Sequence, residues 1–321
     1  MTNRIALIGF IILSVARLVT ADEPDQRKPL TTQETVTVSD NGRALGFRIG
    51  EQHLATYVYK HEKVPRPFFA RVMAPGGLQV TRNFPPLADK DQTDHATMHP
   101  GIWMAFGDIS GEDFWRNKGR VIHERFTEKP TGGRGIARFK QRKSYQRPDG
   151  VLVCHEDFRC TLRILPEGYL LEWDATFEPV NDKEFYFGDQ EEMGLGIRVA
   201  TPITELKSGR ITDSENRRGA RNVWSHSSAW CDYSGRVNDQ TVGITILCNP
   251  ENFRGSWMHA RNYGLIAANP FGRKAMNKGP TSRTVVKAGE SLRLRYGIFL
   301  HGEAPDLNHV YRKYVKLTSD R

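Results

Sequence analysis

The chain has 321 residues, of which 38% are hydrophobic and 26% charged, and its formal net charge is +9 at pH 7. This composition is typical of a folded globular protein rather than a disordered or fibrous one. The positive charge weakly favours acidic partners. The chain has no nucleic-acid recognition motif, so we expect no nucleic-acid partner.

The N-terminus reads MTNR followed by the apolar run IALIGFIILSVA, and small residues follow at 19–21. This pattern is typical of a signal peptide over residues 1–21. The apolar run is too short to span a bilayer, and no later segment is long enough, so we expect no membrane span in the mature chain. We predict export to the periplasm or the extracellular space, cleavage before Asp22, and a disordered lead over residues 22–33. Without Arg4 and Arg17, the mature net charge is +9 − 2 = +7.

Alternation of apolar and polar residues with a period of two predicts strands along most of the chain. In chain order these predicted strands lie in residues 34–39, 44–49, 66–73, 78–82, 102–109, 150–165, 168–179, 184–202, 241–248 and 290–300. Only residues 305–315 have helical spacing. No linker or internal repeat interrupts residues 34–321, so we predict a single all-β domain, a large antiparallel β-sandwich with a short C-terminal helix.

The four cysteines do not follow paired zinc spacing. Cys154 and Cys160 share the apolar face of one predicted strand, where six residues separate them by about 20 Å, well beyond disulfide reach. Cys248 shares an apolar face with its strand neighbours. We therefore predict that the cysteines are mostly free and structural.

Residues 83–101 contain several prolines and predict a long loop that carries His95 and His99. Asp94, Trp103, Asp108 and Trp115 lie close by in the sequence, and long loops in compact domains are often functional. The H-x-x-x-H spacing also occurs in metal sites. Because Pro100 and the loop remove the helix that would make the spacing meaningful, we expect no metal and no cofactor.

In residues 184–202 the apolar side chains occupy odd positions. The opposite face then presents Gln190, Glu192 and Arg198 between glycines, which leaves room for a ligand. Glu191 falls on the apolar face unless a bulge shifts the register, so it is a second choice.

Two further segments contribute candidates. Glu156 is the one charge on the apolar face of residues 150–165, which suits either a general acid or an ion pair with an arginine. In a strand, alternate residues lie on one face, and this pattern places four odd-numbered residues together: His259, Arg261, Tyr263 and Asn269. An acid/base group would then lie beside hydrogen-bond donors. Basic runs at 138–147 and 217–221 are either solvated loops or binding sites for an anionic sugar polymer.

Five ordered blocks resemble the PmoA-like family, whose members are often labelled "methane oxygenase PmoA". The blocks are TDHATMHPGIW, AFGDISGEDFWRNKG, GDQEEMGLGIRVATP, AWCDYSG and HARNYGLIAANPFG. The resemblance implies a β-sandwich similar to galactose mutarotase, and a role in carbohydrate metabolism.

We therefore predict an exported carbohydrate-active enzyme of glycosidase, lyase or epimerase type. Its expected catalytic residues are His95, His99, Glu192 and His259, with Glu192 as the partner carboxylate. The expected substrate-binding residues are Asp94, Trp103, Asp108, Trp115, Glu156, Gln190, Glu191, Arg198, Arg261, Tyr263 and Asn269. A noncatalytic glycan-binding protein is the alternative, and a metal-dependent oxygenase, as the family label suggests, is the third.

Overall fold

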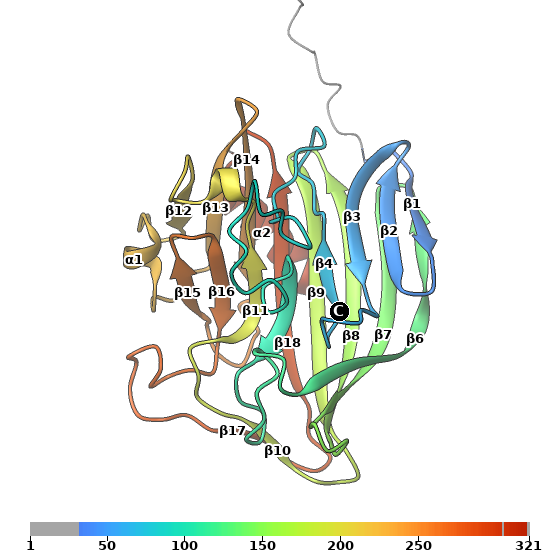
Figure 1. Cartoon of the computed structure of the whole chain (residues 1–321), viewed down its shortest axis with the longest axis vertical. Helices are drawn as coiled ribbons and strands as arrows, with labels where there is room; N and C mark the ends of the chain where they lie inside the picture. Colours follow the sequence, from blue (N-terminus) through green and yellow to red (C-terminus); the bar gives the residue numbers. More distant parts are fainter. Residues whose placement is uncertain (1–31, 304, 320–321) are drawn as a thin grey trace, which may run out of the picture.

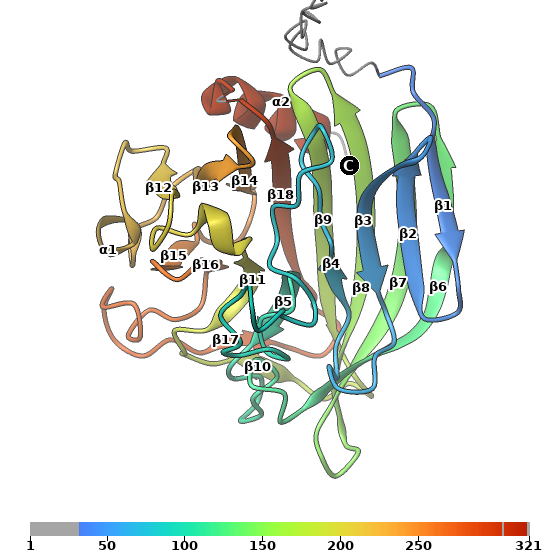
Figure 2. The ribbon, with the colours of Figure 1, turned by 45° about the horizontal axis from the view of Figure 1, so that its top comes forward.

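Two antiparallel sheets stack face to face in the computed structural model, which describes residues 32–303 and 305–319 (Figures 1 and 2). The predicted signal peptide, residues 1–21, and residues 22–31 of the predicted lead lie outside the described residues. The all-β fold class is confirmed, as are the antiparallel pairing and the short C-terminal helix. Within the described residues, no helix has the length and apolar character needed to cross a membrane.

The first sheet has eight strands. From one edge to the other they are β1 (Val36–Asp40), β2 (Ala44–Ile49), β3 (Gln52–Val58), β4 (Phe68–Ala70), β5 (Ile102–Phe106), β11 (Met193–Arg198), β16 (Leu265–Asn269) and β15 (Trp257–Arg261). The chain leaves this sheet after β5 and returns with β11, which pairs with both β5 and β16.

The second sheet also has eight strands. In order they are β12 (Arg210–Asp213), β13 (Trp230–Val237), β14 (Gln240–Cys248), β18 (Leu292–His301), β9 (Gly168–Pro179), β8 (Leu152–Leu165), β7 (Ile136–Gln146) and β6 (Arg120–Gly133). The smaller elements are β10 (Phe185–Phe187) and β17 (Thr284–Val286), which pair with each other, and the helices η1 (Thr201–Ile203), α1 (Ala220–Val223) and α2 (Leu307–Ser319).

The core lies between the two sheets, because alternate side chains of each strand point inward. Tyr57 of the first sheet packs 4.9 Å from Phe139 of the second, measured between ring centroids. All four cysteines are buried and unpaired, which confirms the prediction for Cys154 and Cys160. Alternation would place Leu152 on the same apolar face as Cys154, but it is 38% exposed, and the β7–β8 register shifts next to it, between Tyr145 and Gln146.

Helix α2 covers part of the outer face of the second sheet (Figure 2). Its Val310 and Tyr314 pack among Leu170, Leu247 and Phe299, which belong to three neighbouring strands. These strand residues are large and apolar although they point away from the main core. The helix therefore keeps a second apolar surface from water.

The predicted strand at 184–202 is two strands in different sheets. Residues 188–192 form no regular structure, and they separate β10 from β11. Two-residue alternation holds within β11, where Leu195 and Ile197 face the core, but it cannot be extended back across the bend. This interruption changes the position of the carboxylates that precede β11.

Candidate functional site

The outer face of the first sheet carries most of the predicted polar residues. Four residues are paired side by side across neighbouring strands of this sheet: Trp103 on β5, Gly196 on β11, Ala267 on β16 and His259 on β15. A Cβ atom at Gly196 would lie 2.7 Å from the Trp103 ring and 2.9 Å from the Trp115 ring. The glycine therefore lets both indoles pack directly on the strand.

The loop between β4 and β5 lies over this face (Figure 1). Arg82, only 2% exposed, organises the loop by donating to the backbone carbonyls of Gln92 at 2.8 Å, Asp94 at 2.7 Å and His99 at 3.1 Å. His95 has a φ of 51°, in the left-handed region that non-glycine residues rarely adopt. The surrounding hydrogen bonds hold this strained residue in place.

Asp94 links the loop to the sheet. Its two carboxylate oxygens accept hydrogen bonds from Arg198, at 2.8 and 3.0 Å, and Oδ2 also lies 2.8 Å from Nδ1 of His95. Burial raises the pKa of Asp94, but the hydrogen bonds from Arg198 and His95 outweigh it and lower the pKa to about 2. Asp94 is therefore a carboxylate at neutral pH, while the His95 side chain is 42% exposed.

His99 lies deeper than His95. It is 1% exposed, its ring stacks on Trp103 at 5.1 Å between centroids, and its Nε2 lies 3.4 Å from the Trp115 indole nitrogen. Burial, followed by the nearby Arg198 and His95, lowers the pKa of His99 to about 2. His99 is thus a neutral ring in the floor of the site, which does not suit the predicted exchange of protons near neutral pH.

The depressed pKa of His99 predicts a dependence of stability on pH. Below the ordinary value of 6.5 the unfolded chain protonates this residue and the folded chain does not, so the free energy of unfolding falls as pH falls. The expected slope is about 1.4 kcal/mol per pH unit. Urea unfolding of the wild type and His99→Gln, at about pH 6.5 and about pH 5, should show a smaller loss in the variant. Equal losses would contradict the assignment.

A second cluster forms around Glu191. Its Oε1 accepts from the Trp224 indole at 2.7 Å and from Arg261 at 2.6 Å, and it lies 3.3 Å from Nδ1 of His259. Burial raises the pKa of Glu191, but His259 and Arg261 outweigh it and lower the pKa to about 2. The carboxylate paired with His259 is therefore Glu191 and not Glu192.

Asn269 positions this carboxylate. Its amide donates to the backbone carbonyls of Gln190 at 2.8 Å and Glu191 at 2.9 Å, and its Oδ1 accepts from the backbone nitrogens of Phe271 and Gly272, each at 2.9 Å. The side chain is fully buried. The backbone therefore occupies both the amide nitrogen and the oxygen of the Asn269 side chain. Asn269 holds the segment that carries Glu191 in place, whereas the sequence pattern predicts that it contacts the substrate.

Tyr263 lies between the two clusters, in the turn that joins β15 to β16. Its ring centroid is 4.5 Å from the guanidinium carbon of Arg198. Burial raises the pKa of Tyr263, against the opposing charges of Arg198 and Arg261. Glu192 and Asp94 also act on this pKa, so groups from both clusters lie near one phenol.

Several predicted residues have other surroundings. Glu192 forms an ion pair with Arg116, which also contacts Asp113 at 3.1 Å. Trp103 and Trp115 are fully buried, so neither offers an open face for stacking on a sugar. Asp108 accepts from the backbone of Gly111 at 2.8 Å and stabilises a turn. The Gln190 side chain is exposed at the bend before β11.

Glu156 does not reach this face. It is fully buried between the sheets, where Oε1 lies 2.6 Å from Nζ of Lys143 and Oε2 accepts from the Tyr145 hydroxyl at 2.8 Å. The ion-pair alternative for Glu156 is therefore observed, with a lysine in place of the expected arginine. Lys143 stands opposite Glu156 in the β7–β8 register.

The sequence reasoning missed five side chains that build or hold the site. They are Arg66, Arg82, Gln92, Arg116 and Trp224. Arg116 lies within the block AFGDISGEDFWRNKG, and the other four lie outside the five blocks. The only local signal was the density of arginine and tryptophan near the predicted blocks.

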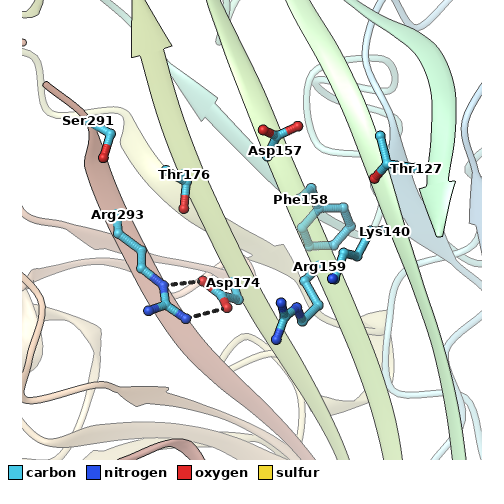
Figure 3. Close-up of a pocket in the computed structure, with 9 residues that line it drawn as sticks. All are labelled: Thr127, Lys140, Asp157, Phe158, Arg159, Asp174, Thr176, Ser291 and Arg293. Carbon is cyan, nitrogen blue, oxygen red and sulfur yellow. Dashed lines mark hydrogen bonds and ion pairs between the residues drawn. The ribbon is translucent and has the colours of Figure 1, made fainter. Parts of the chain in front are cut away.

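Two of the hollows on the surface of the described residues are lined by many charged side chains. One, which we call the basic hollow, has a volume of about 870 Å³ and lies beside His95, between residues 59–66, 95–98 and 116–123. The other, of about 630 Å³, lies on the outer face of the second sheet, where Arg293 donates twice to Asp174 at 2.7 Å (Figure 3). Among the described residues, no three His, Cys, Asp or Glu side chains gather as a metal ion would require.

The fold and this face define an antiparallel β-sandwich protein with a charged, hydrogen-bonded site on the outer face of one sheet. The chain belongs to DUF6807, a family of unknown function, whose sequence profile matches residues 44–314. A comparison with curated proteins finds no match.

Solved structures with a similar chain course include two galactose mutarotase relatives. The chain is similar to a galactose mutarotase-like protein from Lactobacillus casei, with 10% identity, a TM-score of 0.39, and coverage of 83% of this chain and 100% of that chain. It is also similar to a galactose mutarotase related enzyme from Lactobacillus acidophilus, with 11% identity, a TM-score of 0.33, and coverage of 83% of this chain and 97% of that chain.

A β-arabinopyranosidase is also similar, with 10% identity, a TM-score of 0.41 and coverage of 83% of this chain; the chain spans 40% of that protein. Similarity at this level assigns no activity. Two of these names agree with the predicted likeness to galactose mutarotase, while none carries the PmoA label, which stays a prediction.

Proposed function

We propose that this protein is an exported enzyme that transfers protons on a sugar, by epimerisation or elimination, with His95 as base and Tyr263 as acid. The observation that carries the proposal is the chain of contacts from Arg198 through Asp94 to His95. Export is supported by the apolar run near the N-terminus alone.

The Asp94 carboxylate determines which ring nitrogen of His95 carries the proton. An ionised carboxylate 2.8 Å from Nδ1 of His95 favours the tautomer with its proton on Nδ1. Nε2 then carries the free electron pair and is able to accept a proton. Arg198, 1% exposed, holds Asp94 through two bonds, so the imidazole is oriented before substrate arrives.

The charge states favour proton transfer at carbon over glycoside hydrolysis. Hydrolysis by paired carboxyl groups needs one of them protonated near neutral pH. Asp94 and Glu191 have pKa values lowered to about 2, so both are ionised. A histidine base and a tyrosine acid fit another chemistry, in which the base removes a proton from carbon and the acid returns one to carbon or to a departing oxygen.

The choice of a sugar rests on the polar groups and on the sequence resemblance. Arg261, Glu191 and Tyr263 are partly exposed and present donors and acceptors on one face, which suits a ligand with many hydroxyls. A noncatalytic glycan-binding protein would use the same groups without needing an oriented histidine.

The decisive experiment follows conversion of a panel of neutral, acidic and oxidised sugars in heavy water. Epimerisation should leave deuterium on carbon in the sugar, and elimination should give an unsaturated product, both visible by mass spectrometry. Release of reducing ends without either signature would show a glycosidase instead. A rise in melting temperature without conversion would show a binding protein.

Replacing Tyr263 by phenylalanine removes only the hydroxyl. We expect kcat to fall roughly tenfold to a hundredfold, because the general acid is lost. The ring should still pack on Arg198, so the melting temperature should stay close to that of the wild type. Unchanged kcat, measured on the same sugar, would remove Tyr263 from the mechanism.

A further inference from the structure

The basic hollow contains positive charge that the protein does not neutralise. Its lining includes the exposed cations Lys60, Lys63, Lys118 and Arg120. Over residues 32–303 and 305–319, none of the four forms an ion pair with a carboxylate. The one acidic side chain in the lining, Glu62, already pairs with Arg43 at 3.1 Å.

Arg66 adds a buried charge at the wall of the same hollow. It is 3% exposed and donates to the backbone carbonyls of Phe114 at 3.1 Å and Trp115 at 2.9 Å. Burial lowers the pKa of Arg66 to about 9, which still leaves it protonated at neutral pH. Its hydrogen-bond partners are neutral, so its positive charge persists.

Several other basic groups are paired with carboxylates. Three cations of the basic run on β7 pair with carboxylates of β6, β9 and β8, through Lys140–Glu128 at 3.2 Å, Arg142–Glu178 at 2.9 Å and Lys143–Glu156 at 2.6 Å. The hollow of Figure 3 likewise sets Asp174 against Arg293. The basic hollow differs from these places because four exposed cations, without carboxylate partners among the described residues, line one concave surface, which borders His95 and Arg116.

We propose that the basic hollow binds a negatively charged group of the substrate, a carboxylate or a sulfate on a sugar. This inference rests on the proposed function, because His95 at the border is the base of that function. Cations converging on a concave surface attract and hold an anion more strongly than they would on a flat one. The volume of about 870 Å³ is large enough for a sugar ring with its neighbours.

The test measures binding of three trisaccharides by calorimetry: neutral galactotriose, trigalacturonate and a sulfated galactotriose. At least one anionic sugar should bind more tightly than the neutral one, and added salt should weaken that binding. The double variant Lys63→Gln/Lys118→Gln should raise its Kd about tenfold. Lys287→Gln, an exposed lysine that does not line the hollow, is the control and should bind like the wild type.

The outcomes separate this inference from the proposed function. Equal affinity for neutral and anionic sugars, no binding of any of them, or no effect of the double variant would overturn it, whatever His95 does. Anion-selective binding with full turnover by His95→Ala would support the hollow and refute the proposed base. Preference between trigalacturonate and the sulfated sugar identifies the anionic group.

Discussion

His95→Ala is expected to lower turnover of the sugar by about a hundredfold or more, because the variant loses the base of the reaction. The fold should be unaffected, since the side chain is 42% exposed and contacts Asp94 at the protein surface. Steady-state kinetics should show the loss in kcat, and thermal unfolding should give a melting temperature close to that of the wild type.

His309 supplies the matched control. It is another exposed histidine near a carboxylate, with Nε2 3.6 Å from Glu167, but it belongs to α2 on the second sheet. His309→Ala should keep full activity. If His95→Ala retains more than about half of the wild-type kcat, the base lies elsewhere, and His259 beside Glu191 is the next candidate.

Lys143→Met is expected to destabilise the protein by about 3–5 kcal/mol, because it leaves Glu156 buried without its cation. Lys143 is 3% exposed and Glu156 is fully buried, so water cannot solvate the remaining charge. Urea unfolding measures the loss, and the activity of the folded fraction should not change, since neither residue reaches the outer face of the first sheet.

A second substitution tests the cause. Adding Glu156→Gln removes the unpaired charge and keeps an acceptor for the Tyr145 hydroxyl, so the double variant should regain a large part of the lost stability. If the loss of stability in the double variant equals the sum of the losses in the two single variants, Lys143 and Glu156 are not coupled. A fall in kcat for the folded protein would return Glu156 to the list of catalytic candidates.

Many of the strands could be predicted because side-chain alternation is a local property. Residues 120–133 and 136–146 form β6 and β7 without having been predicted, and the predicted strand at 78–82 forms only isolated bridges. Residues 168–179 were predicted as a strand and form β9, while residues 305–315 were predicted helical and form most of α2. The same rule placed Arg198 on the outer face of β11. It could not decide between Glu191 and Glu192 as the partner of His259, because the bend at 188–192 interrupts the alternation on which the rule depends.

The sequence alone could not predict which charged side chains pair with each other. The period of a strand says which side chains share a face but not which strand lies next to it. Lys143 neutralises Glu156 only because the β7–β8 register sets them opposite each other. Asp94 likewise meets Arg198, more than a hundred residues later, because the loop between β4 and β5 lies over β11.

The sequence by itself determined the fold class, the inward faces of the strands, the unpaired cysteines and the segments that carry polar chemistry. Only the tertiary structure decided which of those groups meet and in what charge state. His95 and His99 are four residues apart, yet one is half-exposed and the other is buried on Trp103 with a pKa near 2. Burial and partners set an ionisation state, and both arise from contacts between segments distant in the chain.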